Sequence, residues 1–249
     1  MSSNTIYLVT GANRGIGKGL AAAYLSRPNN TVVAAVRDAS HSTSKALESL
    51  TLGASSKLII VSIDNNNEDA PAAAIKLLQS AHGISHLDVL IANAAINDDY
   101  STTATIKLDV LKSHVAVNAY APILLFQAAL PLLEKAKVPK FVAIGTPMAS
   151  IGGIESRPFS TAAYSMSKVM LHFAMRKIHF EHADIVSFPI DPGFVQTDMG
   201  NSGAQRFGMK EATTTIADSV GFITSTIDEA TKEKHSGHFP TLEGGDFAW

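Results

Sequence analysis

The stretch Thr10-Gly-Ala-Asn-Arg-Gly-Ile-Gly17 decides the fold of this 249-residue chain. An apolar run of β type, Ile6 to Val9, precedes it, and a helical pattern that includes Leu20, Tyr24 and Leu25 follows it. A strand, a glycine turn and a helix in this order aim backbone N–H groups and the positive helix end at one point. The order therefore predicts a βα unit that binds a pyrophosphate. The alternative is an ordinary glycine-rich βα turn.

Beyond this turn, short apolar runs alternate with stretches of helical spacing. Such alternation predicts an α/β fold, a Rossmann-type doubly wound parallel sheet of about seven strands with helices on both faces. Neither a break in composition nor an internal repeat marks a second domain, so we expect residues 1–249 to form one domain. We expect strands at 6–10, 31–36, 58–63, 87–92, 140–144 and 185–190, with a last short one near 238–239, and helices around 17–25, 45–52, 71–81, 111–134 and 162–182.

The residues that follow the expected strands carry most of the chemically informative side chains. In doubly wound sheets the ligand lies beyond the carboxyl ends of the strands. Six strand ends of this chain therefore predict a single cleft. They are followed, in chain order, by the glycine turn, Arg37, Asp64, Asn93-Ala-Ala95, the segment from Thr146 to Ser150, and Asp191-Pro-Gly193.

Composition excludes several classes of function. The chain is 46% hydrophobic, which allows a sizeable core, and its net charge of −2 disfavours a nucleic-acid partner. It contains no cysteine, and so no disulfide, thiolate metal site or cysteine nucleophile. The sequence runs from Met1-Ser-Ser-Asn4 directly into the first strand without a secretory signal, so we expect a cytoplasmic protein.

Histidines and one apolar stretch each suggest a function that we do not predict. His172, His179 and His182 share a predicted helix, but no His-Glu-x-x-His signature occurs, so we expect solvated or interface histidines and no metal. The stretch Val115 to Leu133 lacks charge and approaches the length of a membrane span. It contains Asn118 and two prolines, and we expect a helix between the sheet and a neighbouring subunit, without membrane insertion.

Tyr164 and Lys168 form the most informative pair of side chains. Their i, i+4 spacing places them on one face of a helix, one turn apart. A free phenol has a pKa of about 10, and a nearby ammonium favours the phenolate. The pair therefore predicts proton transfer at neutral pH, although the four-residue spacing alone is common by chance.

Taken together, these motifs resemble the short-chain dehydrogenase/reductase family over nearly the full length of the chain. The matching motifs are Thr10-Gly-x-x-x-Gly-Ile-Gly17, Asn93-Ala-Ala95, Asn118, Tyr164-x-x-x-Lys168 and Pro192-Gly-x-Val-x-Thr197. Within the family, the chain looks most like fungal norsolorinic-acid-type ketoreductases and sniffer-type carbonyl reductases. Asp198-Met199 and the ending Gly244-Gly-x-x-x-Trp249 support that narrower resemblance more weakly.

The resemblance implies hydride transfer between a nicotinamide and a carbonyl or alcohol group. It implies that Tyr164 protonates the developing alkoxide, and that Lys168 holds the ribose hydroxyls and lowers the Tyr164 pKa. Asn118 is implied to kink its helix and to position a water near Lys168. The alternative for Asn118 is a polar side chain bonded within a helix bend. Asn93 is implied to lie beside the adenine ribose, and Val195 and Thr197 beside the carboxamide.

The segment after the fifth strand departs from the family pattern, which has a catalytic serine there. This chain reads Gly145-Thr-Pro-Met-Ala-Ser150 instead. Alignment of the strand ends favours Thr146 as the hydroxyl donor, whereas Ser150 serves if the loop folds back. The absence of the serine also leaves open a fold kept for binding with weak catalysis.

Charge at the second strand end favours NADP(H) as the cofactor. An NAD site uses a carboxylate there, and an NADP site uses a cation for the extra phosphate. Val36 takes the acid position, Arg37 follows, and Arg14 lies in the glycine turn, whereas Asp38 is one residue too far along. By resemblance, Asp64 holds the adenine amino group. The expected cofactor contacts are Gly11, Asn13, Arg14, Gly15, Ile16, Gly17, Arg37, Asp64, Asn93, Ala94, Ala95, Tyr164, Lys168, Pro192, Gly193, Val195 and Thr197.

The substrate side is less specified. The glycine-rich segment 200–208 predicts a mobile lid, at about 198–212, over the cleft. An apolar pocket for a bulky or aromatic ketone is one interpretation of its hydrophobic residues, and simple packing is the other. These residues are Met148, Phe159, Phe194, Met199 and Phe207.

The sequence thus predicts an NADPH-dependent ketoreductase that acts on a bulky carbonyl compound, in fungal-type secondary metabolism. One alternative is an enzyme of the same fold that retains the cofactor for non-redox work. Another is a nucleotide-sensing binding protein, for which the Tyr164 phenol has no evident use. By resemblance, the helix over 115–133 and the Tyr164 helix predict a homodimer or homotetramer.

Overall fold

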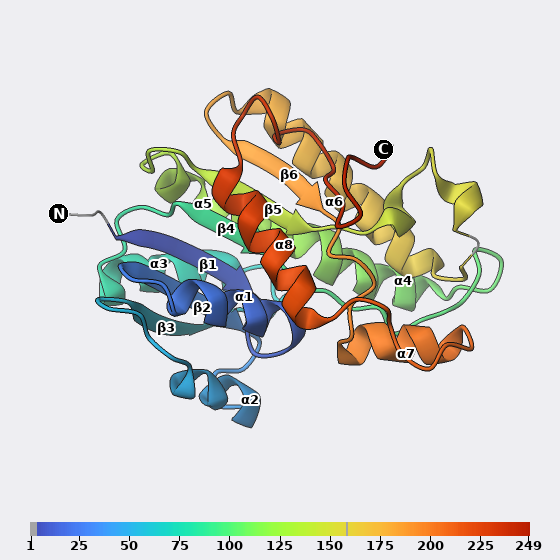
Figure 1. Cartoon of the computed structure of the whole chain (residues 1–249), viewed down its shortest axis with the longest axis horizontal. Helices are drawn as coiled ribbons and strands as arrows, with labels where there is room; N and C mark the ends of the chain where they lie inside the picture. The colour runs from blue at the N-terminus through green and yellow to red at the C-terminus, as the bar shows by residue number, and fades with distance from the viewer. Residues whose placement is uncertain (1–3, 158) are drawn as a thin grey trace.

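A computed structural model describes residues 4–157 and 159–249. Its centre is a parallel sheet of six strands in the order β3-β2-β1-β4-β5-β6 (Figure 1). All five neighbouring strand pairs are parallel, so every carboxyl end lies at the same edge of the sheet. The strands are β1 (Thr5–Thr10), β2 (Asn30–Val36), β3 (Lys57–Ser62), β4 (Val89–Ala92), β5 (Lys140–Ile144) and β6 (Val186–Ile190).

Helices cover both faces of this sheet. On one face, α1 (Gly15–Leu25) packs against α8 (Ile216–Glu229). On the other face, α3 (Ala70–His82) packs against α5 (Ala121–Leu133), and α6 (Ala162–Glu181) lies beside α5. The remaining helices are α2 (Ser42–Lys45), α4 (Leu108–Val115) and α7 (Asp198–Arg206).

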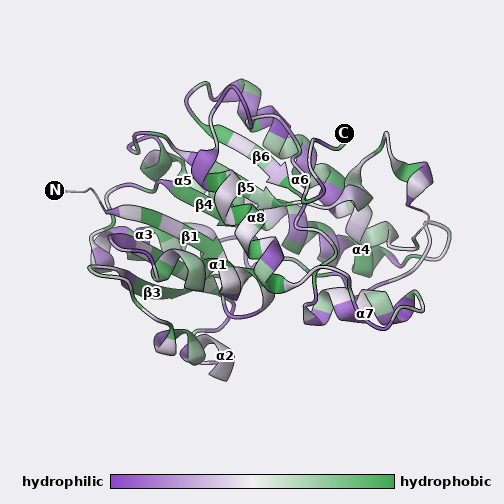
Figure 2. Ribbon diagram, viewed as in Figure 1, coloured by the Kyte–Doolittle hydropathy of each residue, from purple (hydrophilic) through white to green (hydrophobic). Residues whose placement is uncertain are grey.

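The two apolar layers follow from strand alternation. In β1, Leu8 belongs to the cluster under α3, α5 and α6, whereas Tyr7 and Val9 belong to the cluster under α1 and α8. Because successive side chains of a strand point to opposite faces, a strand covered on both sides is apolar throughout. Figure 2 shows this as hydrophobic colouring along most of the strands. The predicted fold class, a doubly wound α/β sheet, is confirmed.

The expected last strand near 238–239 does not form as a strand. Among the described residues, the segment contributes a single parallel bridge, between Asp191 and Thr241. The Asp191 amide donates to the Pro240 carbonyl, but Pro240 has no N–H, and the Thr241 amide turns to the Gly245 carbonyl. The ladder therefore stops after one residue, and the sheet has six strands rather than about seven.

Two helices were not predicted and one was misplaced. Around residues 45–52, the structure has the short α2 and a 3₁₀ turn, Ala46–Ser49, instead of one helix. The glycine-rich lid segment is largely helical as α7. The helix α8 has a recognisable sequence signal, because the Thr215 side chain accepts from the Asp218 amide as an N-cap.

The apolar stretch that we expected over 111–134 forms a continuous helix, Leu108–Leu133. By length and composition it is the one described helix that could cross a membrane. Half of its most apolar window is buried, and it packs on α3 and α6, which accounts for its apolar character. A π-helical segment, Ala116–Tyr120, interrupts its α-helical spacing.

Candidate active site

The glycine turn closes tightly around the end of β1. Gly11 has φ +63°, in the left-handed region, and α1 begins at Gly15. A Cβ on Gly17 would lie 2.3 Å from the Gly11 carbonyl oxygen and 2.5 Å from Nδ2 of Asn93, so only glycine fits there. Ile16 packs partly buried against the core between α1 and the sheet. The first amides of α1 are thereby left free to face an anion.

Asn93 and Ala94 join the end of β4 to this turn. The Asn93 side chain donates to the Thr10 carbonyl at 2.8 Å, and the Thr10 hydroxyl accepts from the Asn93 and Ala94 amides at 3.0 Å each. Ala95 is half-buried beside them. These bonds hold two neighbouring strand ends in register.

Tyr164 and Lys168 lie one turn apart on α6, with the Lys168 nitrogen 5.8 Å from the centre of the phenol ring. Lys168 is 1% exposed and donates to the Ile144 carbonyl at 2.9 Å, and burial lowers its pKa to about 8. Burial also raises the pKa of Tyr164 to about 12, and this is the larger effect. The Thr146 side chain lowers the same pKa by a smaller amount. The lowering of this pKa by Lys168, which the resemblance implies, stays a prediction. Tyr164 stays protonated at neutral pH.

Thr146 and Ser150, the two candidates for the hydroxyl donor, are placed differently. Thr146 follows β5, its side chain lowers the pKa of Tyr164, and its oxygen accepts from the Met148 amide at 3.3 Å. The Ser150 hydroxyl instead donates to the Ala248 carbonyl at 2.6 Å, in the C-terminal segment. The structure therefore brings Thr146, and not Ser150, to the phenol.

Asn118 lies in the π-helical segment and is fully buried. Its side chain accepts from the Ile96 amide at 2.8 Å and donates to the Ile96 carbonyl at 2.9 Å. It also donates to the Ser167 hydroxyl at 3.0 Å, which in turn donates to the Tyr164 carbonyl. Asn118 therefore ties the loop after β4 to the turn of α6 that carries Tyr164.

The segment after β6 lines the same edge. Gly193 has φ +80°, and its amide donates to Oδ1 of Asp191 at 3.1 Å. Pro192 and Val195 are buried. Thr197 caps α7 by accepting from the Gly200 amide, and its methyl lies 3.1 Å from the position of a Cβ on Gly15. The helix α7 thus begins directly beside the glycine turn.

At the second strand end, two arginines are exposed and the carboxylate of Asp38 is hydrogen-bonded. Arg37 is exposed, and Arg14 is exposed at 4.0 Å from Asp198. Asp38 accepts from the amide and the hydroxyl of Ser40, at 2.8 and 2.7 Å. Nearby, Asn13 donates to the Thr43 hydroxyl at 2.7 Å, and Asp64 accepts from the Asn66 amide after β3. This edge suits a phosphate better than a diol.

On the substrate side, aromatic rings connect the lid to two other loops. Phe207, after α7, lies 4.7 Å from Phe159 and 5.8 Å from Tyr100, centre to centre. Phe194 lies within 4 Å of the position of a Cβ on Gly203 in α7. Tyr100 was not identified from the sequence. Met148 and Met199 are both half-buried near these segments.

Two further residues at this edge were missed as site residues. Asp191 is buried, its pKa is raised to about 6 by burial first, and it contributes to the raised pKa of Tyr164. His172, predicted to be solvated or at an interface, is buried and accepts from the Thr146 amide at 3.3 Å. Its i+4 spacing from Lys168 was a signal for this position.

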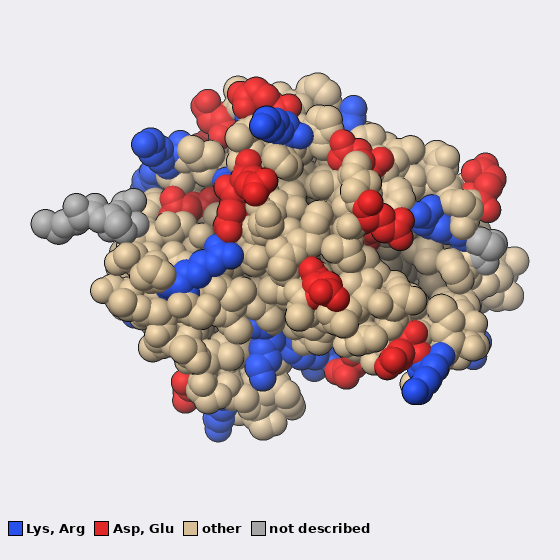
Figure 3. Space-filling view, viewed as in Figure 1, with Lys and Arg blue, Asp and Glu red and all other residues tan. Residues whose placement is uncertain are grey.

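No group of three or more His, Cys, Asp or Glu side chains that could hold a metal ion occurs in the part of the chain that the structure describes. On the face shown in Figure 3, acidic and basic side chains are interspersed.

Comparison with known proteins agrees with this geometry. The family model described as short chain dehydrogenase matches residues 5–206. The chain belongs to the short-chain dehydrogenase family. The resemblance inferred from the motifs is confirmed, and the protein is an oxidoreductase that acts on carbonyl or alcohol groups.

Within the family, the chain is similar to ketoreductases and carbonyl reductases. The chain is 50% identical over 247 residues to norsolorinic acid ketoreductase of Dothistroma septosporum, covering 98% of this chain and 92% of the relative. It is 46% identical over 250 residues to norsolorinic acid ketoreductase of Aspergillus parasiticus, covering 98% and 91%. The NADPH-bound carbonyl reductase from chicken fatty liver superposes with a TM-score of 0.85 at 27% identity, covering 99% and 100%. The carbonyl reductase Sniffer of Drosophila melanogaster gives 0.83 at 26%, with the same coverage.

Proposed function

We propose that this short-chain dehydrogenase is an NADPH-dependent ketoreductase in which Tyr164 is the general acid for a bulky or aromatic carbonyl substrate. One observation carries the proposal: the Tyr164 phenol lies at the sheet edge that also bears the glycine turn, with the Lys168 nitrogen 5.8 Å from the centre of its ring. A pure nucleotide-binding protein has no need for a half-buried phenol at that place.

In this proposal the cofactor and three residues have separate roles in the reduction. NADPH, when bound, supplies the hydride. The Thr146 hydroxyl donates to the substrate carbonyl oxygen and polarises it, as a donor aimed at developing negative charge does. Tyr164, which burial keeps protonated, gives its proton to the alkoxide. Lys168 uses one of its three donors on Ile144, so two remain for ribose hydroxyls.

The cofactor preference rests on charge. The exposed Arg14 and Arg37 can pair with a phosphate on the adenine ribose, while Ser40 occupies the carboxylate of Asp38. The NADPH in the chicken carbonyl reductase supports the same choice. In this proposal the first amides of α1 take the pyrophosphate, and Asp64 and Asn93 lie along the adenosine.

The substrate class rests on the aromatic residues around α7. Phe159 and Phe207 pack together beside α7 and offer an apolar surface suited to a large ring system. The norsolorinic acid ketoreductases support a bulky ketone and a place in fungal-type secondary metabolism. The segment 198–212 is proposed as the lid, and a cytoplasmic location stays a prediction.

Oligomerisation is part of the proposal. The outer face of α6 exposes Met166, Met170, Phe173 and Phe180, with Phe173 and Phe180 67% and 70% exposed. Positions at this spacing form one stripe along a helix, and an apolar stripe on the surface is typical of a subunit interface. We propose a homodimer, or a homotetramer built on it, through this face.

Turnover with Tyr164→Phe tests the proposed mechanism. We expect the wild type to oxidise NADPH with at least one ketone of an aromatic panel, and Tyr164→Phe to lower kcat by about 10²- to 10⁴-fold. NADPH binding, measured by its fluorescence, should be unchanged. If the wild type turns over no ketone but binds NADPH, a cofactor-retaining non-redox enzyme or a sensor becomes the better assignment. A fully active Tyr164→Phe would refute the role of the phenol.

A further inference from the structure

The helix α6 carries a third side chain on the face of Tyr164 and Lys168. His172 follows at i+8 from Tyr164 and i+4 from Lys168, so the three side chains lie on one side, a turn apart. Its imidazole is 3% exposed. Imidazoles are costly to bury without a partner, which makes its contacts informative.

The partner of the imidazole is the backbone of the proposed hydroxyl donor. The Thr146 amide donates to Nε2 of His172 at 3.3 Å. The preceding amide, Gly145, pairs with the Ile190 carbonyl at 2.7 Å as the last rung between β5 and β6. The strand ladder therefore ends at Gly145, and His172 takes the next amide in place of a strand partner.

The contact is close as well as polar. A Cβ on Gly145 would lie 2.8 Å from Nε2 of His172 and 3.0 Å from the Phe239 ring. Glycine at 145 thus allows the imidazole to reach the end of β5. Because Thr146 is extended and its oxygen accepts from the Met148 amide, the direction of its hydroxyl depends on where its backbone is held.

Acceptance at Nε2 sets the protonation of the ring. A nitrogen that accepts has a free lone pair, so the single proton of His172 lies on Nδ1. Burial, and then the nearby Lys168, lower the pKa of His172 to about 3. The imidazole therefore remains neutral, and remains an acceptor, across the pH range in which an enzyme of this kind works.

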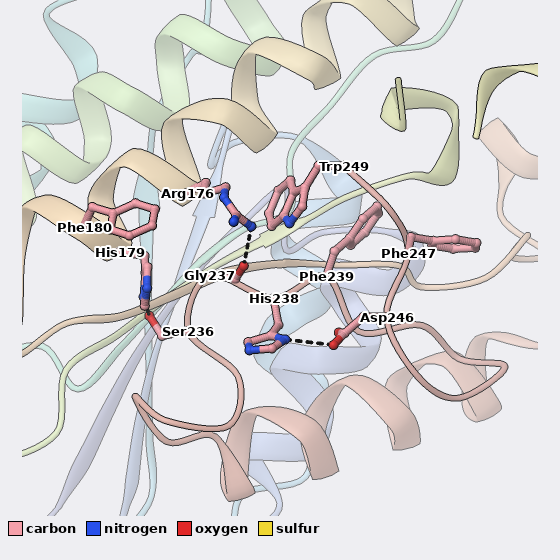
Figure 4. A pocket seen from close by; sticks show the side chains of 10 residues that line it. All are labelled: Arg176, His179, Phe180, Ser236, Gly237, His238, Phe239, Asp246, Phe247 and Trp249. Atoms are coloured by element: carbon pink, nitrogen blue, oxygen red, sulfur yellow. Dashed lines mark hydrogen bonds and ion pairs between the residues drawn. The ribbon is translucent and has the colours of Figure 1, made fainter. Parts of the chain in front are cut away.

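Aromatic rings hold the imidazole from behind. Phe239 lies 4.6 Å from it, edge to face, and Trp249 lies 6.3 Å away at 90°. Arg176 stacks on Trp249 at 4.8 Å and donates to the Gly237 carbonyl. Phe239 and Trp249 also line a cavity of about 320 Å³ next to Arg176 and His238 (Figure 4). The C-terminal segment thus backs His172 against the end of β5.

We propose that His172 is a positioning residue for ketone reduction: its neutral imidazole holds the Thr146 amide and so aims the Thr146 hydroxyl at Tyr164 and the substrate carbonyl. This inference rests on the proposed ketoreductase function and extends it to a residue that does not touch the substrate. The packing of residues 236–249 has a role in this proposal as well, because it holds the His172 imidazole in place.

Nuclear magnetic resonance tests the bond without turnover. In the ¹⁵N-labelled wild-type protein we expect the His172 nitrogens to report the Nδ1–H tautomer from pH 5 to 8, with a scalar coupling between Nε2 and the Thr146 amide nitrogen. The Thr146 amide should exchange slowly with solvent. An Nε2–H tautomer, or an unprotected Thr146 amide, would overturn the inference.

Two substitutions separate the acceptor from the packing. His172→Gln retains an acceptor at a similar reach and loses the ring contacts, whereas His172→Phe retains the ring and loses the acceptor. We expect His172→Phe to lower kcat about tenfold with the NADPH KM unchanged, and His172→Gln to stay within about threefold of wild type. A purely structural role predicts the reverse order, because Phe packs better against Phe239 and Trp249.

A double-mutant cycle with Thr146→Val closes the test. If His172 acts through the Thr146 hydroxyl, His172→Phe should cost less than about twofold in kcat once that hydroxyl is absent. Equal losses in both backgrounds would overturn the inference. If the Thr146–His172 bond is present but the wild type reduces no ketone, both the proposed function and the positioning role are refuted. If the wild type reduces a ketone but the bond is absent, only the positioning role is refuted.

Discussion

At the end of β5, the hydroxyls of Thr146 and Ser150 have different partners, and kinetics can distinguish them. The Thr146 side chain lowers the pKa of Tyr164, whereas the Ser150 hydroxyl donates to the Ala248 carbonyl. We expect Thr146→Val to lower kcat about 10²-fold, the usual effect of removing a donor to a developing oxyanion, and Ser150→Ala to lower it less than about threefold. Steady-state rates with a ketone that the wild type reduces provide the measurement.

Cofactor binding is the control for this pair. NADPH should bind both variants as it binds the wild type, because neither hydroxyl belongs to the glycine turn. Equal losses in the two variants, or a larger loss in Ser150→Ala, would contradict the assignment of Thr146.

Asp191 predicts a pH-dependent stability. Burial raises its pKa from 3.8 to about 6, so the folded state binds more protons than the unfolded state between these values. Its favourable contribution is fully present below about pH 4 and is lost as the pH rises through 6. Asp191→Asn, which can still accept from the Gly193 amide, removes this loss. We expect its free energy of unfolding, relative to wild type, to rise by about 2 kcal/mol from pH 4 to pH 7.

Asp38 supplies the matched control, measured by denaturant unfolding at both pH values. It is exposed, and its pKa is lowered chiefly by the Ser40 side chain, so it titrates mostly below pH 4. The free energy of unfolding of Asp38→Asn, relative to wild type, should therefore change little between pH 4 and pH 7. A stability difference between Asp191→Asn and wild type that does not change with pH would refute the buried ionisation.

Among the elements, α1 depends on a glycine at position 17. A Cβ on Gly17 meets the Gly11 carbonyl and the Asn93 side chain, so Gly17→Ala must shift the turn or the end of β4. We expect a loss of at least about 2 kcal/mol of stability and weaker NADPH binding. In α8, Gly221 is exposed with open space at its Cβ position. Gly221→Ala should add about 0.5–1 kcal/mol, and thermal unfolding of both variants compares them. Equal effects would contradict the tight turn.

How far the elements could be predicted depends on how local their signals are. The strands are predictable because most of them are buried on both faces and so form continuous apolar runs. The glycine turn and the Tyr164–Lys168 pair have fixed spacing. The helix α7 was missed because its glycines resemble a loop, and its stability comes from the Thr197 cap and aromatic contacts. The helix α8 was missed although its sequence has an N-cap residue, Thr215.

The site residues that were missed depend on contacts between distant segments. His172 looks like any helix histidine until Phe239 and Trp249, from the C-terminal segment, cover it. The choice between Thr146 and Ser150 likewise needed the Ala248 carbonyl, which no local pattern places beside Ser150. Long-range packing, rather than propensity, decides such residues.

For the whole molecule, the exposed stripe on α6 predicts the assembly state. Phe173 and Phe180 are among the most exposed large apolar side chains described, and burying such rings between subunits removes apolar surface from water. We expect the wild type to be a dimer or tetramer by light scattering after size exclusion, and Phe173→Glu with Phe180→Glu to be a monomer, since a pair of like charges at an interface is repelled and desolvated. Leu52→Glu, at an exposed apolar residue beyond the 3₁₀ turn on another part of the surface, should leave the assembly unchanged. A monomeric wild type, or a double variant that still assembles, would show that this face meets no second copy of the chain.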